Sequence, residues 1–204
     1  MIVTDIAEQS ASKVKIEIDG AFAFVLYKGE LRKYGIKSGE TIPDTVYEEL
    51  TRHVLPKRAT LRCMNLLKSR DYTVAQLKTK LRQGGYPEAS IESAIAYVAS
   101  YGYVDDLRYA EEFIRCSQET KSRRRIDCDL QRKGINPDTV KQAWENWQKQ
   151  GNAQDEEEQI RRLLAKKHYD GAHADRKEMQ KIYAFLARRG FDLENIRKVL
   201  FTST

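Results

Sequence analysis

The chain has 204 residues, of which 32% are charged and 41% hydrophobic, and 36 Lys and Arg against 30 Asp and Glu give a formal net charge of +6. This length allows one or two domains or an array of repeats, and the basic balance favours an anionic partner. No apolar run approaches the ~20 residues of a membrane span. No glycine-rich phosphate-binding motif supports nucleotide binding.

The cysteines and the N-terminus indicate the compartment. Cys63, Cys116 and Cys128 are an odd-numbered set without CxxC spacing, which fits a reducing environment better than a disulfide framework. The first residues, MIVTDIAEQS, have neither the basic start nor the apolar stretch of a secretory signal. We therefore expect a soluble, cytoplasmic protein that has no membrane association.

Residues 1–58 form a module unlike the rest of the chain. Residues 14–18 (VKIEI) alternate apolar and polar, Asp19-Gly20 follows, and residues 21–27 (AFAFVLY) come next, which together predict a β-hairpin. Pro43 suits the first turn of a helix that we expect to run to about Val54, where Pro56 ends it. This module carries nine acids and nine bases and is therefore neutral.

From Ala59 onward the apolar pattern is helical and repeats three times. Each copy places apolar residues at the same relative positions, 0, 4, 9, 14 and 18, at intervals of 49 and 56 residues. The copies are Leu77, Leu81, Tyr86, Ile91 and Ile95; Ile126, Leu130, Ile135, Val140 and Trp144; and Ile182, Leu186, Phe191, Ile196 and Leu200. Such periodic self-similarity is typical of a repeat protein.

The shared spacing predicts the structure of each copy. Apolar residues four apart share one helix face, and Gly85, Gly134 or Gly190 can end that helix in a left-handed conformation. A second helix follows, and another amphipathic helix precedes each pair, at about 59–70, 106–119 and 155–168. We therefore expect a mainly α fold, an elongated array of tandem three-helix repeats over 59–104, 105–151 and 152–204, behind the hairpin module of 1–58.

The stretch YVDD, residues 103–106, resembles the metal-binding loop of a polymerase, because paired carboxylates can hold Mg²⁺. That site needs a β-hairpin, whereas the flanking patterns here are helical. Asp105 stands where a helix N-cap needs an acceptor, Asp106 lies in the first turn, and Gly102 can end the preceding helix. We interpret the pair as capping residues rather than as a metal site.

The same stretch carries a family resemblance. GYVDDLRYA (102–110), followed by KSRRRIDCDLQRKGI (121–135), resembles the RecX family, and RDYTVAQLKTKLRQGGY (70–86) is similar to its first repeat. The resemblance is close over about 59–150 and looser over 155–202, where LARRGF (186–191) stands out. It implies a bacterial regulator that binds the RecA–DNA filament and mainly inhibits its recombinase, ATPase and co-protease activities in DNA repair and the SOS response.

The function that the resemblance implies has one alternative: the protein could be a nucleic-acid-binding helical module that acts without a protein filament. Either way we expect no enzyme activity, no cofactor and no bound metal. The partners would be the RecA filament and single- or double-stranded DNA, and the protein would be a monomer. His168 and His173 lie near Asp170 and Asp175, but a polar loop explains them better than a metal site.

The candidate contacts to the filament or to DNA are ten cations of the second and third repeats. They are Lys121, Arg123, Arg124, Arg125, Arg132, Lys133, Arg161, Arg162, Lys166 and Lys167. Cations at the end of a helix complement its dipole, whereas cations at the start oppose it. Lys121 and Arg123–Arg125 stand at the start of an expected helix, so we predict that they have no stabilising role within it and serve an external partner, although a solvated face is the alternative.

Overall fold

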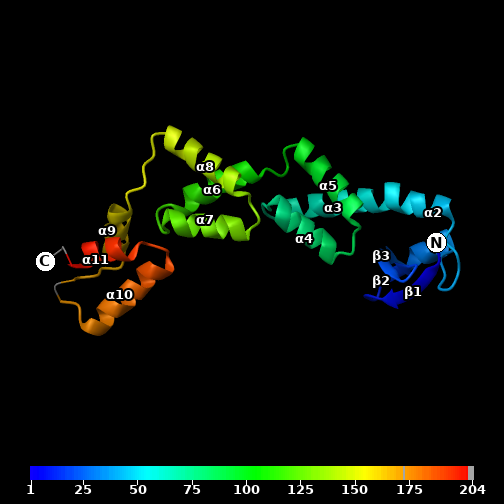
Figure 1. The fold of residues 1–204 in the computed structure, drawn as a ribbon, viewed down its shortest axis with the longest axis horizontal. Helices are drawn as coiled ribbons and strands as arrows, with labels where there is room; N and C mark the ends of the chain where they lie inside the picture. Colours follow the sequence, from blue (N-terminus) through cyan, green and yellow to red (C-terminus); the bar gives the residue numbers. More distant parts are fainter. Residues whose placement is uncertain (172, 202–204) are drawn as a thin grey trace. The chain divides into compact units, whose positions relative to one another are not determined.

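We describe residues 1–171 and 173–201 of a computed structural model of the chain, which contains a three-stranded sheet and helices grouped in threes (Figure 1). The chain divides into two compact units, Met1–Asp105 and Asp106–Thr204. The first unit holds the sheet module and one helical repeat, and the second holds two further repeats.

The N-terminal sheet contains β1 (Val3–Glu8), β2 (Lys13–Ile18) and β3 (Ala21–Tyr27), which are antiparallel and lie in sequence order (Figure 1). The predicted hairpin is confirmed, and Asp19 and Gly20 turn it with φ values of 51° and 80°, as a tight two-residue hairpin turn requires. The strand β1 escapes prediction because Val3 is its only fully buried residue, so the strand lacks a clear alternation.

A helical segment covers one face of the sheet. After the short helix α1 (Lys28–Tyr34), the chain forms α2 (Asp44–Glu49), a π-helical turn η1 (Leu50–Val54) and α3 (Leu55–Leu67) without interruption. The prediction that Pro56 ends this helix is wrong. The wide turn of η1, closed by Leu55 N–H donating to Leu50 O, opens the backbone where a proline would otherwise collide with the preceding turn.

The first repeat consists of α3, α4 (Val74–Gln83) and α5 (Glu88–Ser100). A capping box starts α4: Thr73 Oγ1 accepts from Gln76 N–H and the Gln76 side chain accepts from Thr73 N–H. The core of this repeat is a cluster that includes Ala59, Leu77, Leu81 and Ile91, which are all fully buried.

The second repeat consists of α6 (Asp106–Ser117), α7 (Arg123–Arg132) and α8 (Pro137–Lys149). The third consists of α9 (Glu156–Lys166), α10 (Arg176–Arg188) and α11 (Leu193–Phe201). Asn136 caps α8 by accepting from Asp138 N–H, and Asp192 precedes α11 and accepts from Glu194 N–H.

The repeated apolar positions form the cores of all three repeats. All fifteen are buried except Tyr86, which is half-buried. Gly85, Gly134 and Gly190 have φ values of 76°, 83° and 84°, the left-handed conformation expected after the middle helix. The predicted fold class, tandem three-helix repeats behind a small module with a β-hairpin, is therefore confirmed.

The Asp-Asp pair lies between two helices. Gly102 has a φ of 68° after α5, and α6 begins at Asp106, so Asp105 stands directly before the first helical residue. Residues 73–150, all of which the structure describes, form helices and turns without a strand. This stretch therefore lacks the hairpin on which a polymerase-like metal pair would sit, and the helical context that we predicted for it is confirmed.

Candidate basic interface of the second and third repeats

The start of α7 is anchored to the third repeat. Ser122 is its N-cap, and its side chain accepts a hydrogen bond from Arg125 N–H at 3.3 Å. The same hydroxyl donates to Gly190 O at 2.7 Å, and Ser122 N–H donates to Arg189 O at 3.1 Å. These bonds fix the basic start of α7 beside the turn that follows α10.

Asp129 forms ion pairs with three of the predicted contact residues. Its carboxylate lies 2.9 Å from Lys121 Nζ, 3.2 Å from Arg125 Nε and 3.7 Å from an Arg132 nitrogen. The prediction that the cations at the helix start have no local role is therefore wrong for Lys121 and Arg125. One carboxylate a turn further along the helix offsets the unfavourable dipole interaction.

The ionisation of Asp129 reflects these neighbours. Partial burial alone would raise the pKa of its carboxyl group, but the hydrogen bond from Lys121 and the positive charges of Lys121, Arg125 and Arg132 together lower the pKa below its ordinary value. Asp129 thus stays ionised at neutral pH and stabilises the folded repeat.

Aromatic rings hold further cations of this region. The Arg123 guanidinium lies 4.9 Å from the Trp144 ring centre, and Lys133 Nζ lies 5.5 Å from that of Phe113. Trp144 Nε1 donates to Asp127 Oδ1 at 2.7 Å, which orients the ring. Cation–π contacts position a cation without neutralising its charge, so Arg123 can still attract an anion.

Arg124 differs from its neighbours. It is exposed, and in the described part of the chain it has neither an acidic nor an aromatic partner. Arg123 and Arg124 line an open pocket between α7 and the third repeat, together with the acidic residues Asp127, Glu156 and Asp192. This mixed lining disfavours an anion inside the pocket, so the exposed guanidinium groups are better placed to meet a partner outside it.

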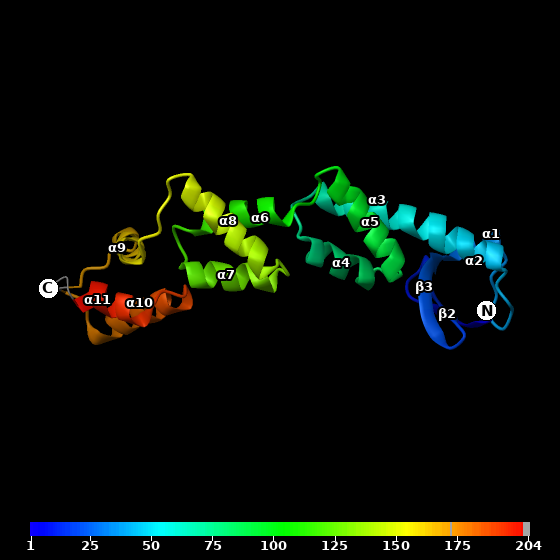
Figure 2. The same ribbon diagram turned by 45° about the horizontal axis from the view of Figure 1, so that its top comes forward.

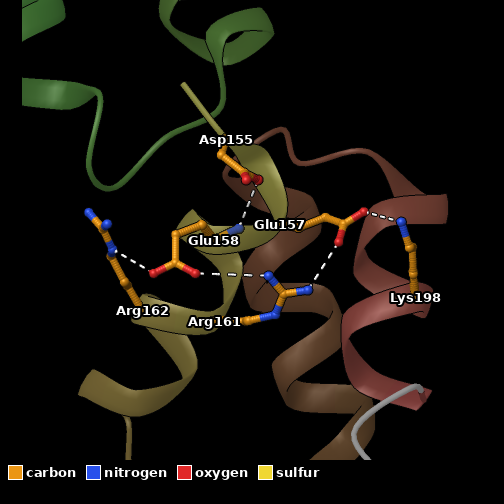
Figure 3. Close-up of polar contacts among 6 residues, drawn as sticks. All are labelled: Asp155, Glu157, Glu158, Arg161, Arg162 and Lys198. Atoms are coloured by element: carbon orange, nitrogen blue, oxygen red, sulfur yellow. Dashed lines mark hydrogen bonds and ion pairs between the residues drawn. The ribbon is translucent and has the colours of Figure 1, made fainter. Parts of the chain in front are cut away.

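The second predicted patch, on α9, is largely paired with acids (Figure 3). Arg161 lies 3.0 Å from Glu157, and Arg162 lies 3.0 Å from Glu158, whose N–H donates to Asp155, the N-cap of α9. Glu157 also pairs with Lys198 of α11. Exposed pairs of this kind are worth only about 0–1 kcal/mol, so a stronger anionic partner could replace them.

The remaining two predicted contacts also have partners. Lys166 Nζ lies 3.6 Å from Glu119, and Lys167 Nζ lies 4.5 Å from the ring centre of Phe185. The ring of Phe185 also packs against the Arg189 guanidinium at 3.7 Å. The ten predicted cations therefore all belong to one unit. Among the four at the start of α7, Arg123 and Arg124 hold the charge that is least compensated.

Sequence reasoning missed Asp129 as the common ion-pair partner on this surface, although the i,i+4 spacing to Arg125 and the i,i+3 spacing to Arg132 were visible signals.

The histidine-containing loop pairs one histidine with an acid: His173 Nδ1 lies 2.7 Å from Asp170 Oδ2. Within residues 1–171 and 173–201, no group of three or more His, Cys, Asp or Glu side chains could hold a metal ion. No helix in these ranges has the length and apolar composition to cross a membrane.

We expect Asp129→Ala to lower the free energy of unfolding at neutral pH by about 1–3 kcal/mol, because three cations lose a charge-assisted partner. Glu145→Gln, which removes an exposed ion pair at 4.0 Å on α8, is the matched control and should change little. Urea unfolding checks both variants. An Asp129→Ala protein as stable as the control would contradict the assignment.

The effect should depend on pH in a stated direction. The pKa of Asp129 is lower in the folded protein than in the unfolded chain, whose value is about 3.9. The stabilisation is therefore fully present above pH ~4 and is lost as the pH falls through the folded-state pKa. The stability gap between the wild-type and Asp129→Ala proteins should close as the pH is lowered below ~4.

Comparisons with known proteins agree with this architecture. Three family domains match the chain in order: the first, second and third three-helix domains of RecX, over residues 59–97, 105–143 and 155–200. Among curated relatives, the regulatory protein RecX of Caldanaerobacter subterraneus is 31% identical over 98% of both chains. That of Clostridioides difficile is 28% identical over 98% of this chain and 94% of its own.

Solved structures support the fold. A crystal structure of regulatory protein RecX superposes with a TM-score of 0.58 at 20% identity, covering 97% of this chain and 98% of the other. RecX from Lactobacillus salivarius gives a TM-score of 0.53 at 21% identity, over 72% of this chain and 94% of its own. Because the three domains match in order and a relative of similar length is 31% identical, the chain belongs to the RecX family.

Proposed function

We propose that this protein binds the RecA–DNA filament in the cytoplasm and inhibits its recombinase, ATPase and co-protease activities in DNA repair. The partner comes from the family resemblance, and the relatives named regulatory protein RecX support a regulatory role. Repeated units with similar surfaces suit a filament, because each can make a weak contact and the contacts add through effective concentration.

The observation that supports this proposal most is the pair Arg123 and Arg124 at the start of α7. Arg123 is held by Trp144, Arg124 has no acidic partner in the described residues, and Ser122 fixes their backbone. Arginine can form bidentate pairs with either carboxylates or phosphates. In this proposal the two residues contact the filament, while Arg161, Arg162, Lys166 and Lys167 form a weaker second contact. The first three of these must release their own acids before they can bind.

The test is binding to RecA-coated single-stranded DNA. We expect Arg123→Ala/Arg124→Ala to weaken binding about 10- to 100-fold, because two charge-assisted contacts are lost, and to reduce inhibition of strand exchange and ATP hydrolysis in parallel. Helix content should not change, because both side chains are exposed. If DNA phosphates are the target, the salt dependence should also flatten by about 0.7–0.9 per arginine.

Arg176→Ala/Lys177→Ala is the matched control, because these exposed cations occupy the first two positions of α10 as Arg123 and Arg124 occupy those of α7. The control should bind the filament nearly as the wild type does. Equal loss in both variants, or unchanged inhibition by Arg123→Ala/Arg124→Ala, would remove this contact site. Wild-type protein that fails to inhibit RecA, or whose affinity for bare DNA equals its affinity for the coated strand, would replace the filament function with a stand-alone nucleic-acid-binding one.

A further inference from the structure

A basic pocket lies between the sheet module and the first repeat. Its cations come from three separate elements: Lys13 from β2, Arg58 and Arg62 from one face of α3, and Lys80 from α4. Among the described residues that line it there is no Asp or Glu. With a volume of about 610 Å³, the pocket has the size of a small-molecule site and suits part of an anionic chain.

A tight contact fixes the two walls of this pocket. Val25 N–H of β3 donates to Gly85 O at 3.2 Å, in the turn that follows α4, and the turn lies beside β3 in both ribbon views (Figures 1 and 2). Gly85 has a φ of 76°, and a Cβ atom there would lie 2.2 Å from a methyl carbon of Val25. The close approach therefore requires glycine, and the cations of the sheet and of the helices face a common space.

Two of these cations are held by neighbours. The Tyr27 ring centre lies 5.4 Å from Lys13 Nζ and 4.7 Å from the Arg58 guanidinium. Arg58 also forms an ion pair with Glu30, with both side chains largely buried. Lys13 and Arg58 are thus positioned before any ligand arrives, which lowers the entropy cost of binding.

The other two cations are uncompensated. Arg62 and Lys80 are exposed, and no acid among the described residues lies within ion-pair distance of either. Their neighbours on α4 differ: Lys78 pairs with Glu92 at 2.6 Å, and Arg82 pairs with Glu88 at 2.7 Å. On one helix, the cations outside the pocket have acids and the one that lines the pocket has none. This distribution leaves positive charge where it faces the pocket.

The rest of the lining suggests which anion fits. Leu61 of α3, which is 52% exposed, and the half-buried Tyr86 of the turn after α4 both line the pocket. Asn65 and Gln83 add amide groups that can both donate and accept hydrogen bonds. An acidic peptide would use the cations alone, whereas a nucleic-acid strand with unpaired bases would use the cations, the apolar surface and the amides.

We propose that this pocket, with Arg62 and Lys80 as its main contacts, binds the phosphodiester backbone of a nucleic-acid single strand. This binding goes beyond the proposed filament contact of α7 and does not depend on it. The sheet module thereby has a role, since Lys13 and Tyr27 complete the pocket that α3 and α4 begin. A duplex fits less well because its stacked bases cannot reach Leu61 and Tyr86.

The experiment uses the full chain and a fluorescein-labelled thymidine single strand without RecA, followed by anisotropy over a salt series. Arg62→Ala/Lys80→Ala should reduce the slope of log affinity against log salt by about 1.4, which is two contacts at about 0.7 each. The loss of affinity should therefore grow about 25-fold as salt falls from 1 M to 0.1 M. Leu61→Ala should weaken binding severalfold and leave the slope unchanged, because it removes only apolar contact.

Arg32→Ala/Lys57→Ala is the matched control. It removes two exposed cations of the same unit that lie outside the pocket and have no acidic partner among the described residues. It should bind the strand nearly as the wild type does. Equal weakening in both doubles would overturn the proposal in favour of a diffuse charge effect. Tighter binding of a duplex or of polyglutamate, with the same sensitivity to Arg62→Ala/Lys80→Ala, would overturn it in favour of those ligands. Because RecA is absent, failure here leaves the filament test of Arg123 and Arg124 separately readable.

Discussion

Replacing Leu130 with alanine should lower the free energy of unfolding of the second repeat by about 2–5 kcal/mol. Leu130 is fully buried in a cluster with Ile126, Ala143 and Trp144. The substitution removes buried methyl groups and leaves a cavity that neighbouring helices fill only in part, so the lost transfer energy and the cavity both contribute. Leu130 occupies the same place in its repeat as Leu81 and Leu186, which are also fully buried.

The chain offers a local probe for this prediction. Its two tryptophans, Trp144 and Trp147, both belong to the core of the second repeat, so their fluorescence follows the unfolding of that repeat while far-UV circular dichroism follows all helices. Both probes are needed because repeat arrays can unfold in parts. Leu193→Ala, at a position that is 48% exposed, is the control and should cost far less. A Leu130→Ala protein as stable as this control would refute the common core position.

The helical repeats could be predicted because the sequence signals that specify them are local and occur in three copies. Apolar residues four apart, a glycine after the helix and a capping residue before the next one each act within a few residues. Because the spacing recurs in three copies, the assignment of Leu81, Leu130 and Leu186 to equivalent core positions does not rest on a chance pattern. The errors occurred in the module that has one copy: β1 buries too few side chains to show a pattern, and η1 absorbs Pro56 in a way that no periodicity reveals.

The candidate site was less predictable because its energetics depend on contacts between distant segments. The cations were visible in the sequence, but the contacts that anchor the helix start and neutralise its charges were not. One of them, the hydrogen bond from Ser122 Oγ to Gly190 O, joins residues that are 68 positions apart. Lys121 is eight positions from Asp129, which is beyond the i,i+4 spacing that a helix pattern displays. The basic pocket of the first unit is lined by Lys13, Arg62 and Lys80, which no sequence pattern links. They line one pocket only because β3 and the turn after α4 are in contact.

The second large effect on stability is expected at Gly190, because the start of α7 approaches this residue closely. Its φ is 84°, and a Cβ atom there would lie 2.7 Å from Arg125 Cβ and 2.8 Å from Ser122 Oγ. Alanine would pay about 1–2 kcal/mol for the left-handed backbone and about 1–3 kcal/mol for the forced contact, so we expect Gly190→Ala to destabilise the unit by about 2–5 kcal/mol.

Gly151 separates the two contributions, because its φ is 81° but a Cβ atom there would meet nothing within 4 Å. Gly151→Ala should therefore cost only the backbone term of about 1–2 kcal/mol, and the difference between the two variants measures the contact of α7 with the turn after α10. Gly190→Ala should also speed hydrogen exchange at Ser122 N–H, whose acceptor is Arg189 O, whereas Gly151→Ala should leave that exchange unchanged. Equal unfolding free energies and equal Ser122 exchange in the two variants would show that the start of α7 does not depend on the third repeat, and the anchored position of Arg123 and Arg124 would have to be abandoned.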